Sequence, residues 1–221
     1  MENENNIMQT NNSSPKRFLV YGVEFIYVCI IAICASFLGW IAENAAKLVT
    51  SGIIDSRFHI LPFISPYGLV TLGVFFVLGN PNKLSFLGRP VFKEDSKKAK
   101  LWSNLISLLV IYAVVFFGEL IIGNMWDAFF GVELWNYLSM PLHVTQYAGL
   151  IPTLLYGTGA FLLFKFAFWP SIKLLQKKGN YKVCKIIVCI LGSLLILDTL
   201  WLMLQIIIWG KAPLLWQINL W

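Results

Sequence analysis

Four ionisable residues lie in or beside the long apolar runs of this sequence. A charged side chain in such a run is costly unless it is paired with another group or has a function. Glu43 ends the first run, Arg57 precedes the second, Glu119 ends the third, and Asp198 lies in the second half of the last. A charged residue at the bilayer centre costs about 2.5–3.5 kcal/mol on insertion scales. Three carboxylates at a similar depth can bind or relay a cation or proton, and Arg57 would balance their charge.

Aromatic and amide side chains extend this candidate site. Tyr67 opens the second run, and Trp135 and Asn136 follow the third. The predicted binding residues are Glu43, Arg57, Tyr67, Glu119, Trp135, Asn136 and Asp198. An arginine fork can hold carboxylates through two hydrogen bonds. We therefore expect Arg57 within hydrogen-bonding reach of Glu43 or Glu119, with Trp135 or Tyr67 covering the pair.

Other roles remain open for the same residues. The carboxylates could be satisfied by Arg57 and by hydroxyl groups, and so only lock the bundle together. His59 and His143 could join Glu43 or Glu119 around a metal ion, but no HExxH spacing is present. The four cysteines form two pairs spaced i to i+5, which suits neither a zinc knuckle nor a CxxC motif. We predict no metal site and no other cofactor.

Composition places most of the chain in a membrane. The 221 residues are 58% hydrophobic and only 13% charged, with a mean hydropathy of +0.72. Soluble domains carry about 25% charged residues. A net charge of +6 could indicate nucleic acid, but the Lys and Arg residues fall between the apolar runs. Membrane lipids are therefore the predicted surroundings, and no nucleic-acid partner is expected.

Five apolar stretches are long enough to be predicted as spans, since a bilayer requires about 20 residues. They cover about 18–46, 61–79, 101–123, 144–168 and 183–209. Segment 124–143 is apolar but carries charges and a proline, and is predicted to be interfacial or re-entrant. The expected fold is an all-α membrane bundle of about five transmembrane helices. A disordered tail over 1–17 precedes this single domain of 18–210, and a short tail over 211–221 follows it.

The distribution of basic residues orients the bundle. Six Lys or Arg residues lie between 80 and 100, and five Lys residues lie between 169 and 185. Segments 43–60 and 124–143 hold only Lys47 and Arg57. Because cytoplasmic loops are enriched in Lys and Arg, we predict a multi-pass protein of the cell membrane. Its amino terminus would be cytoplasmic, and its carboxyl terminus and the candidate site would lie toward the outside.

Several polar segments follow one another in a distinctive order. They are Gly39-Trp40-Ile41-Ala42-Glu43, Ser56-Arg57-Phe58-His59, Ser65-Pro66-Tyr67-Gly68, Glu119, Trp135-Asn136-Tyr137-Leu138-Ser139 and the late Asp198. This set resembles a bacterial membrane family called Putative ABC-transporter type IV, or CmpB-like. That family carries GW-x-x-E, NRGF-x-x-GP-x-x-PIYG and W-D/N-Y-S stretches. The resemblance covers roughly residues 25 to 205, and Phe58 replaces the glycine that follows the family's arginine.

The resemblance implies transport. No GxxxxGK[ST] sequence is present to bind nucleotide phosphates, so an ATPase or another membrane subunit would be a separate chain. The first hypothesis is a membrane component of a transport or export system with a polar pocket toward the outer face. An intramembrane enzyme acting on a lipid or envelope substrate is the alternative, and catalysis is the less favoured reading. A non-transporting accessory or sensor subunit is the third. The substrate and the oligomeric state are not indicated.

Overall fold

The computed structural model describes residues 17–80, 83–86, 89–92, 96–133 and 135–220. The predicted tail over 1–17 lies outside this part of the chain except for Arg17, and so does Lys93 of the first basic loop. The helices are α1 (Phe25–Ser51), α2 (Ser65–Leu78), α3 (Lys97–Phe130), α4 (Leu150–Leu162), α5 (Trp169–Lys178) and α6 (Tyr181–Trp209), with a π-helical segment η1 (Leu163–Phe168) between α4 and α5.

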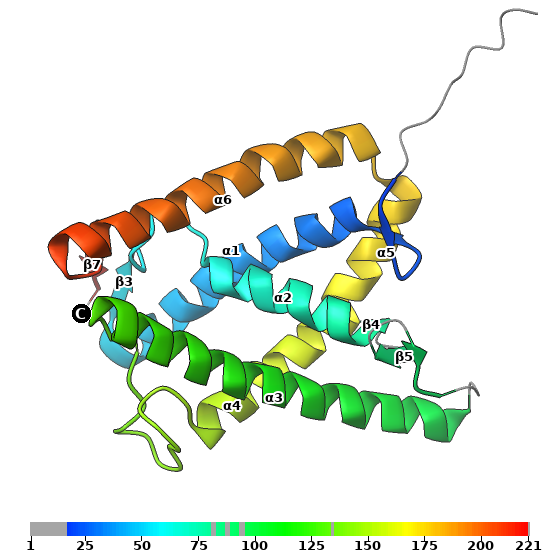
Figure 1. Cartoon of the computed structure of the whole chain (residues 1–221), viewed down its shortest axis with the longest axis horizontal. Coiled ribbons are helices and arrows are strands. Elements are labelled where there is room, and N and C mark those ends of the chain that lie inside the picture. Colours follow the sequence, from blue (N-terminus) through cyan, green and yellow to red (C-terminus); the bar gives the residue numbers. More distant parts are fainter. Residues whose placement is uncertain (1–16, 81–82, 87–88, 93–95, 134, 221) are drawn as a thin grey trace, which may run out of the picture.

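The predicted fold class, an all-α membrane bundle, is confirmed (Figure 1). In the part of the chain that the structure describes, four helical stretches are long and apolar enough to cross a membrane: α1, α3, α6 and the continuous helix Leu150–Lys178. The second predicted span forms as α2, which has 14 residues. At a rise of about 1.5 Å per residue it is about 21 Å long, shorter than a hydrocarbon core of about 30 Å. Its crossing of the membrane remains a prediction.

The helix boundaries differ from the predicted spans where local signals act. Residues 18–24 form a hairpin of β1 (Leu19–Val20) and β2 (Val23–Glu24) rather than the start of the first helix. Helix α3 continues through 124–130 and ends where Gly131 adopts a φ of 61°. Glycine is the residue that adopts this left-handed conformation without steric cost. The first third of the predicted interfacial segment is therefore helix, and a loop over 131–149 follows it.

The fourth long helix contains a π-helical turn where a proline enters it. Pro170 lies in the first turn of α5, directly after η1. Because proline has no backbone N–H and its ring crowds the preceding turn, it disturbs the regular hydrogen bonding before it. The helix nevertheless continues to Lys178 and is followed at once by α6. Much of the second predicted basic loop is thus the end of one helix and the start of the next.

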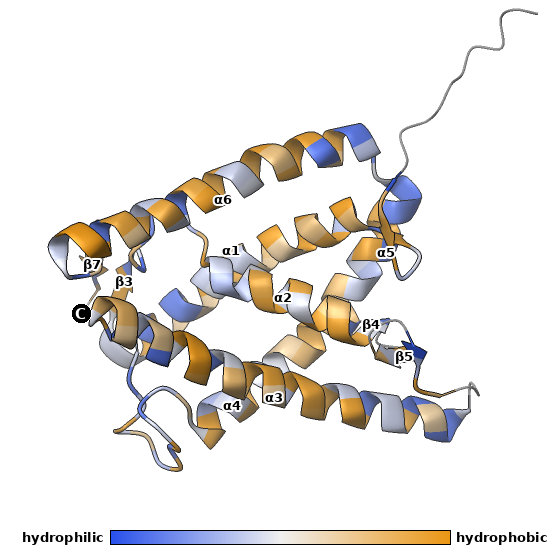
Figure 2. Ribbon diagram, viewed as in Figure 1, coloured by the Kyte–Doolittle hydropathy of each residue, from blue (hydrophilic) through white to orange (hydrophobic). Residues whose placement is uncertain are grey.

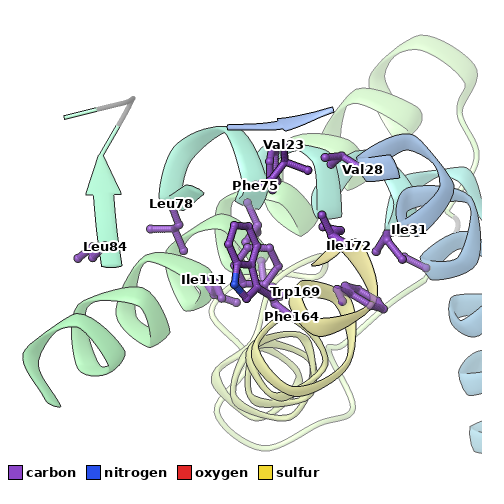
Figure 3. Close-up of a cluster of buried hydrophobic side chains, with 14 residues drawn as sticks. Val23, Val28, Ile31, Phe75, Leu78, Leu84, Ile111, Phe164, Trp169 and Ile172 are labelled. Atoms are coloured by element: carbon purple, nitrogen blue, oxygen red, sulfur yellow. The ribbon is translucent and has the colours of Figure 1, made fainter. Parts of the chain in front are cut away.

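Helix α1 occupies the centre of the bundle and contacts α2, α5 and α6, while α3 packs against α2 and α4. Buried apolar side chains from these helices form one core (Figure 3), which includes Val28, Ile31, Phe75, Ile111, Phe164, Trp169 and Ile172. Outside this core the long helices expose many large apolar side chains. In Figure 2, which colours hydrophobic residues orange, most of the length of these helices is orange. Such an exposed apolar surface suits lipid rather than water.

Short strands join the ends of the helices. Strands β4 (Gly79–Asn80), β5 (Lys83–Phe86) and β6 (Arg89–Pro90) form one small antiparallel sheet. Strand β3 (Ile53–Asp55) follows α1 and pairs antiparallel with β7 (Gln217–Asn219). The predicted carboxyl-terminal tail thus folds back onto the segment that carries Arg57. The Ser56 N–H donates to the Trp216 carbonyl at 3.1 Å, which extends the attachment toward Arg57.

The two ends of the bundle differ in charge. The start of α3, the end of α5 and the start of α6 lie at one end, on the right in Figure 1. We call it the lysine-rich end, and its described basic residues include Lys97, Lys98, Lys100, Lys173, Lys177, Lys178, Lys182 and Lys185. The opposite end holds the end of α1, β3, β7 and the 131–149 loop. The candidate residues gather at this opposite end.

Candidate functional site

The segment after β3 makes a tight turn that presents Arg57 to α1. Arg57 and Phe58 have φ angles of 52° and 70°, and the His59 N–H donates to the Ser56 carbonyl at 3.1 Å. Two positive φ angles at the centre of such a turn define type I′, which usually carries Asn and Gly. The Asp55 side chain stabilises it by accepting from the Arg57 N–H at 2.9 Å.

Arg57 forms the predicted ion pair with Glu43. Its Nη2 donates to Glu43 Oε2 at 2.8 Å, and the two side chains are 21% and 24% exposed. The other oxygen, Oε1, accepts from the Tyr67 hydroxyl at 2.6 Å. Both Glu43 oxygens are therefore hydrogen-bonded, one to a cation and one to a phenol. The expected contact of Arg57 with Glu43, completed by Tyr67, is confirmed.

A glycine on α1 allows Tyr67 to reach this position. A Cβ atom at Gly39 would lie 2.4 Å from Cδ2 of the Tyr67 ring. Gly39 and Glu43 are one turn apart on the same helix face. The ring therefore lies over Gly39 while its hydroxyl bonds to Glu43. The same crossing is tight at Gly68, where a Cβ would lie 2.4 Å from Ser36 Oγ.

Glu119 lies near this pair but has a different environment. Its Oε1 accepts from the Tyr137 hydroxyl at 3.0 Å, while its Oε2 is buried and has no hydrogen-bond partner among the described residues. Glu43 is close enough to interact electrostatically with Glu119. Tyr156 of α4 is within electrostatic reach of Glu43, Glu119 and Arg57. We call these six residues, Glu43, Arg57, Tyr67, Glu119, Tyr137 and Tyr156, the carboxylate cluster.

Tyr137, in the 131–149 loop, is a hydroxyl donor in this cluster. Burial, and then the negative charge of Glu119, raise the pKa of its phenol well above the ordinary value. Tyr137 therefore stays protonated and donates to the carboxylate. Neither Tyr137 nor Tyr156 was among the predicted binding residues. Tyr137 follows the predicted Asn136 in the W-N-Y stretch, so the motif contained this signal.

A second polar network holds β3 against α1. Asp55 is 1% exposed and pairs with Lys47. Its N–H donates to Asn44 Oδ1 at 2.8 Å. Lys47 and Asn44 lie on the last turns of α1, just beyond Glu43. This network fixes the start of the turn and thereby the position of Arg57. Sequence reasoning did not assign a role to Asp55 or Asn44.

Asp198 is joined to His59 rather than to Glu43. Its Oδ2 lies 2.9 Å from His59 Nδ1, and its Oδ1 accepts from the Ile60 N–H at 2.9 Å. Asp198 and His59 are 4% and 6% exposed. One helical position further, the Thr199 and Ser65 hydroxyls lie 2.9 Å apart. Asp198 thus anchors the segment that carries Arg57 to α6.

The two remaining predicted residues have local partners. Trp135 Nε1 donates to the Tyr147 carbonyl at 3.0 Å. Asn136 donates to Glu133 at 3.2 Å, and its Oδ1 accepts from the Leu138 N–H at 2.9 Å. These bonds organise the 131–149 loop, which presents Tyr137 to Glu119. Trp135 and Asn136 act on the loop itself and make no hydrogen bond to the Glu43–Arg57 pair among the described residues.

The histidines do not converge with the cluster. His59 contacts Asp198, and His143 Nδ1 lies 2.9 Å from the Met140 carbonyl. No three His, Cys, Asp or Glu residues in the described ranges are arranged to hold a metal ion. The carboxylates in the carboxylate cluster are instead surrounded by phenols and one guanidinium, a set of groups that donates hydrogen bonds.

The comparison with known protein families matches this region of the chain. A family model described as Putative ABC-transporter type IV matches residues 19–203. The chain belongs to this family. No curated protein and no solved structure matches it. The matched range includes the whole carboxylate cluster, so the cluster lies within the part that Putative ABC-transporter type IV proteins share.

One departure from the Putative ABC-transporter type IV pattern described above lies in the turn at Arg57. Phe58 stands where that pattern has glycine, and its φ of 70° is a value that glycine adopts freely. In this chain the phenylalanine side chain packs against the apolar cluster of Trp126, Leu202 and Ile206. That contact offsets part of the cost of the strained backbone, about 1–3 kcal/mol for a residue of this kind.

Proposed function

We propose that this protein is the membrane component of a transport or export system, and that its carboxylate cluster binds an exchangeable proton or monovalent cation at Glu119. The family description and the long apolar helices support a role connected with membrane transport. The observation that carries the cation site is the Glu119 carboxyl group, whose Oε2 is buried and has no hydrogen-bond partner in the described ranges. A proton or a small cation is the missing partner for that oxygen.

Charge balance supports the same site. The cluster contains two carboxylates, Glu43 and Glu119, and one guanidinium, Arg57. Arg57 bonds to Glu43, which leaves Glu119 with the Tyr137 hydroxyl as its one hydrogen-bond donor among the described side chains. A neutral donor does not compensate a full negative charge in surroundings of low dielectric constant. Glu43 repels Glu119 in addition. Glu119 therefore gains most from taking up a positive charge.

Glu43 and Glu119 have different tasks in this proposal. Glu43, with both oxygens hydrogen-bonded, is the fixed charge that holds Arg57 and Tyr67. Glu119, with one oxygen free, is the exchangeable group. The enzyme hypothesis lacks support because His59 lies against Asp198 and does not reach the two glutamates. Energy for transport would come from a separate subunit, docked at the lysine-rich end.

Orientation is part of the proposal. The basic residues gather at one end of the bundle, which favours the cytoplasm for that end. Reporter fusions after Lys97 and after Lys178 should then be cytoplasmic, and a fusion near Asn136 should be external. An external signal from the Lys97 fusion would reverse the orientation and place the cluster on the cytoplasmic side.

Carbodiimide labelling tests the exchangeable carboxyl group. Hydrophobic carbodiimides react with protonated carboxyl groups in apolar surroundings, so the purified protein should be labelled at Glu119, as read by peptide mass spectrometry. Glu119→Gln should lose the label, while Glu133→Gln should keep it because Glu133 is an exposed loop residue. Labelling should decrease with rising pH or with added sodium or potassium. Absence of label at Glu119 at every pH, or label unaffected by pH and cations, would refute the proposal and favour a structural lock.

A further inference from the structure

Lys165 is a basic residue within the fourth long helix. The carboxylate cluster does not include it and gives no reason for a basic residue at this position. It lies in η1, between the core residues Phe164 and Trp169, which point toward Ile111 in Figure 3. Its Nζ donates to Asn104 Oδ1 of α3 at 2.8 Å. The same Nζ lies 5.7 and 5.4 Å from the ring centroids of Phe161 and Phe166. Lys165 thus joins η1 to α3 through the neutral amide of Asn104, and its ammonium group lies near two aromatic rings of its own helix.

None of these contacts supplies a negative charge. Among the described residues, the ion pairs within 4.0 Å involve Arg17, Lys47, Arg57 and His59, and none involves Lys165. A lysine ammonium group has three N–H donors, of which Asn104 accepts one. The Asn104 Nδ2 group, also a donor, has no partner in the described ranges. The pair therefore presents several unused donors around one positive charge.

The position of the pair indicates where an anion would come from. Asn104 follows Lys97, the first residue of α3, by seven positions, which at about 1.5 Å per residue is about 10 Å. The pair therefore lies near the headgroup boundary of the leaflet at the lysine-rich end. Phe166, whose ring contacts the Lys165 ammonium group, is 67% exposed, and Leu101, one turn before Asn104, is 59% exposed. The pair borders the lipid-facing surface.

We propose that Lys165 and Asn104 bind the phosphate of an anionic phospholipid from this leaflet. The phosphate oxygens would accept from the Lys165 ammonium group and from Asn104 Nδ2, while Phe166 and Leu101 contact the acyl chains. A lipid phosphate is the anion present at this depth, and it removes the cost of an uncompensated cation near the hydrocarbon. This site lies toward the opposite end of α3 from Glu119, and it does not depend on the proposed function.

The decisive variant is Asn104→Asp. Aspartate has nearly the same shape as asparagine, and the 2.8 Å contact would become an internal ion pair. Lys165 would then have its counterion and no longer require a lipid phosphate. Asn124→Asp is the matched control, because it adds the same charge to α3 at an exposed position near the other end. Lys165→Gln removes the cation, and Lys165→Arg keeps it.

Native mass spectrometry in detergent, with phosphatidylglycerol and phosphatidylcholine added in equal amounts, measures the selectivity of lipid binding. We expect the wild type, Asn124→Asp and Lys165→Arg to retain phosphatidylglycerol. We expect Asn104→Asp and Lys165→Gln to lose that preference by about tenfold, the effect of one charge-assisted hydrogen bond. Equal retention of both lipids by the wild type, or unchanged selectivity in Asn104→Asp, would overturn the proposal. Loss of selectivity in Asn124→Asp, or full displacement of the lipid by free glycerol phosphate, would also overturn it.

Discussion

Removing one hydroxyl group tests whether Tyr67 and Glu43 are coupled as the geometry requires. Tyr67→Phe keeps the ring that packs over Gly39 and deletes the donor 2.6 Å from Glu43 Oε1. A hydrogen bond to a charged group contributes about 1.5–3 kcal/mol to stability. Glu43 is 24% exposed and keeps Arg57, so the lower part of that range applies. We expect a loss of about 1.5–2 kcal/mol in the free energy of unfolding.

Tyr112→Phe is a matched control within the same chain. The Tyr112 ring also packs against a glycine, since a Cβ at Gly157 would lie 2.4 Å from its Cδ1. Its hydroxyl, however, lies 2.8 Å from the neutral and exposed Thr158 hydroxyl. Hydrogen bonds between side chains of neighbouring transmembrane helices contribute about 0.6 kcal/mol on average. The two variants therefore differ chiefly in the charge of the partner.

Reversible unfolding in mixed micelles, titrated with sodium dodecyl sulfate and followed by circular dichroism, gives the free energies. The double variant with Glu43→Gln completes a mutant cycle, and the coupling energy should be about 1 kcal/mol or more. A Tyr67→Phe loss no larger than that of Tyr112→Phe would contradict the reasoning. So would a coupling energy below about 0.3 kcal/mol, which is the range expected for independent sites.

Two further stability predictions use the same unfolding assay. Gly39→Ala should lower the free energy of unfolding by about 1–3 kcal/mol because the added Cβ would overlap the Tyr67 ring. Gly118→Ala, whose added Cβ would lie in open space, should be neutral or slightly stabilising. Equal effects of the two substitutions would argue against close packing at Gly39. Asp198→Leu should lower the free energy of unfolding by about 3–5 kcal/mol because it leaves His59 and the Ile60 N–H without an acceptor. Asp198→Asn keeps one acceptor and should lower it by less than half as much. Similar losses in the two variants would show that the charge itself is needed for folding.

The Glu43–Arg57 contact could be predicted from the sequence because only a few groups share that depth. Glu43 ends one apolar run and Arg57 precedes the next, so both lie at the same end of the bundle. An unpaired charge there is costly, and pairing is the simplest solution. Composition and the length of the apolar runs likewise predicted the all-α membrane fold, since runs of about 20 apolar residues are typical of membrane-spanning helices.

The partners of Asp198 and Glu119 could not be predicted in the same way. Sequence fixes the depth of a residue but not the direction in which it faces around the bundle. Asp198 and Glu119 lie at the same end of the bundle as Arg57, yet α6 directs Asp198 to His59, and the 131–149 loop brings Tyr137 to Glu119. Tyr156 was not among the predicted binding residues for the same reason, because the sequence does not show which way a tyrosine in an apolar helix faces.

Local backbone effects account for the differences in helix boundaries. Hydropathy locates the apolar part of a helix, whereas capping signals locate its ends. Helix α3 therefore runs past the last strongly apolar turn to Gly131, and the fourth long helix passes through Pro170 by adopting the π-helical turn η1. Lys165 lies in this turn. The predicted span 144–168 included it because the run as a whole is apolar.

The most direct measurement of the cation site is infrared difference spectroscopy of the protein reconstituted in lipid, as the bathing solution is switched in pH or between sodium and potassium. Wild-type protein should give carboxyl and carboxylate bands that change reversibly, and those bands should disappear in Glu119→Gln. Tyr137→Phe, which removes the hydroxyl donor to Glu119 Oε1, should shift the bands without abolishing them. Identical difference spectra for the wild type and Glu119→Gln would contradict an exchangeable proton or cation at Glu119 and leave the cluster as a structural lock.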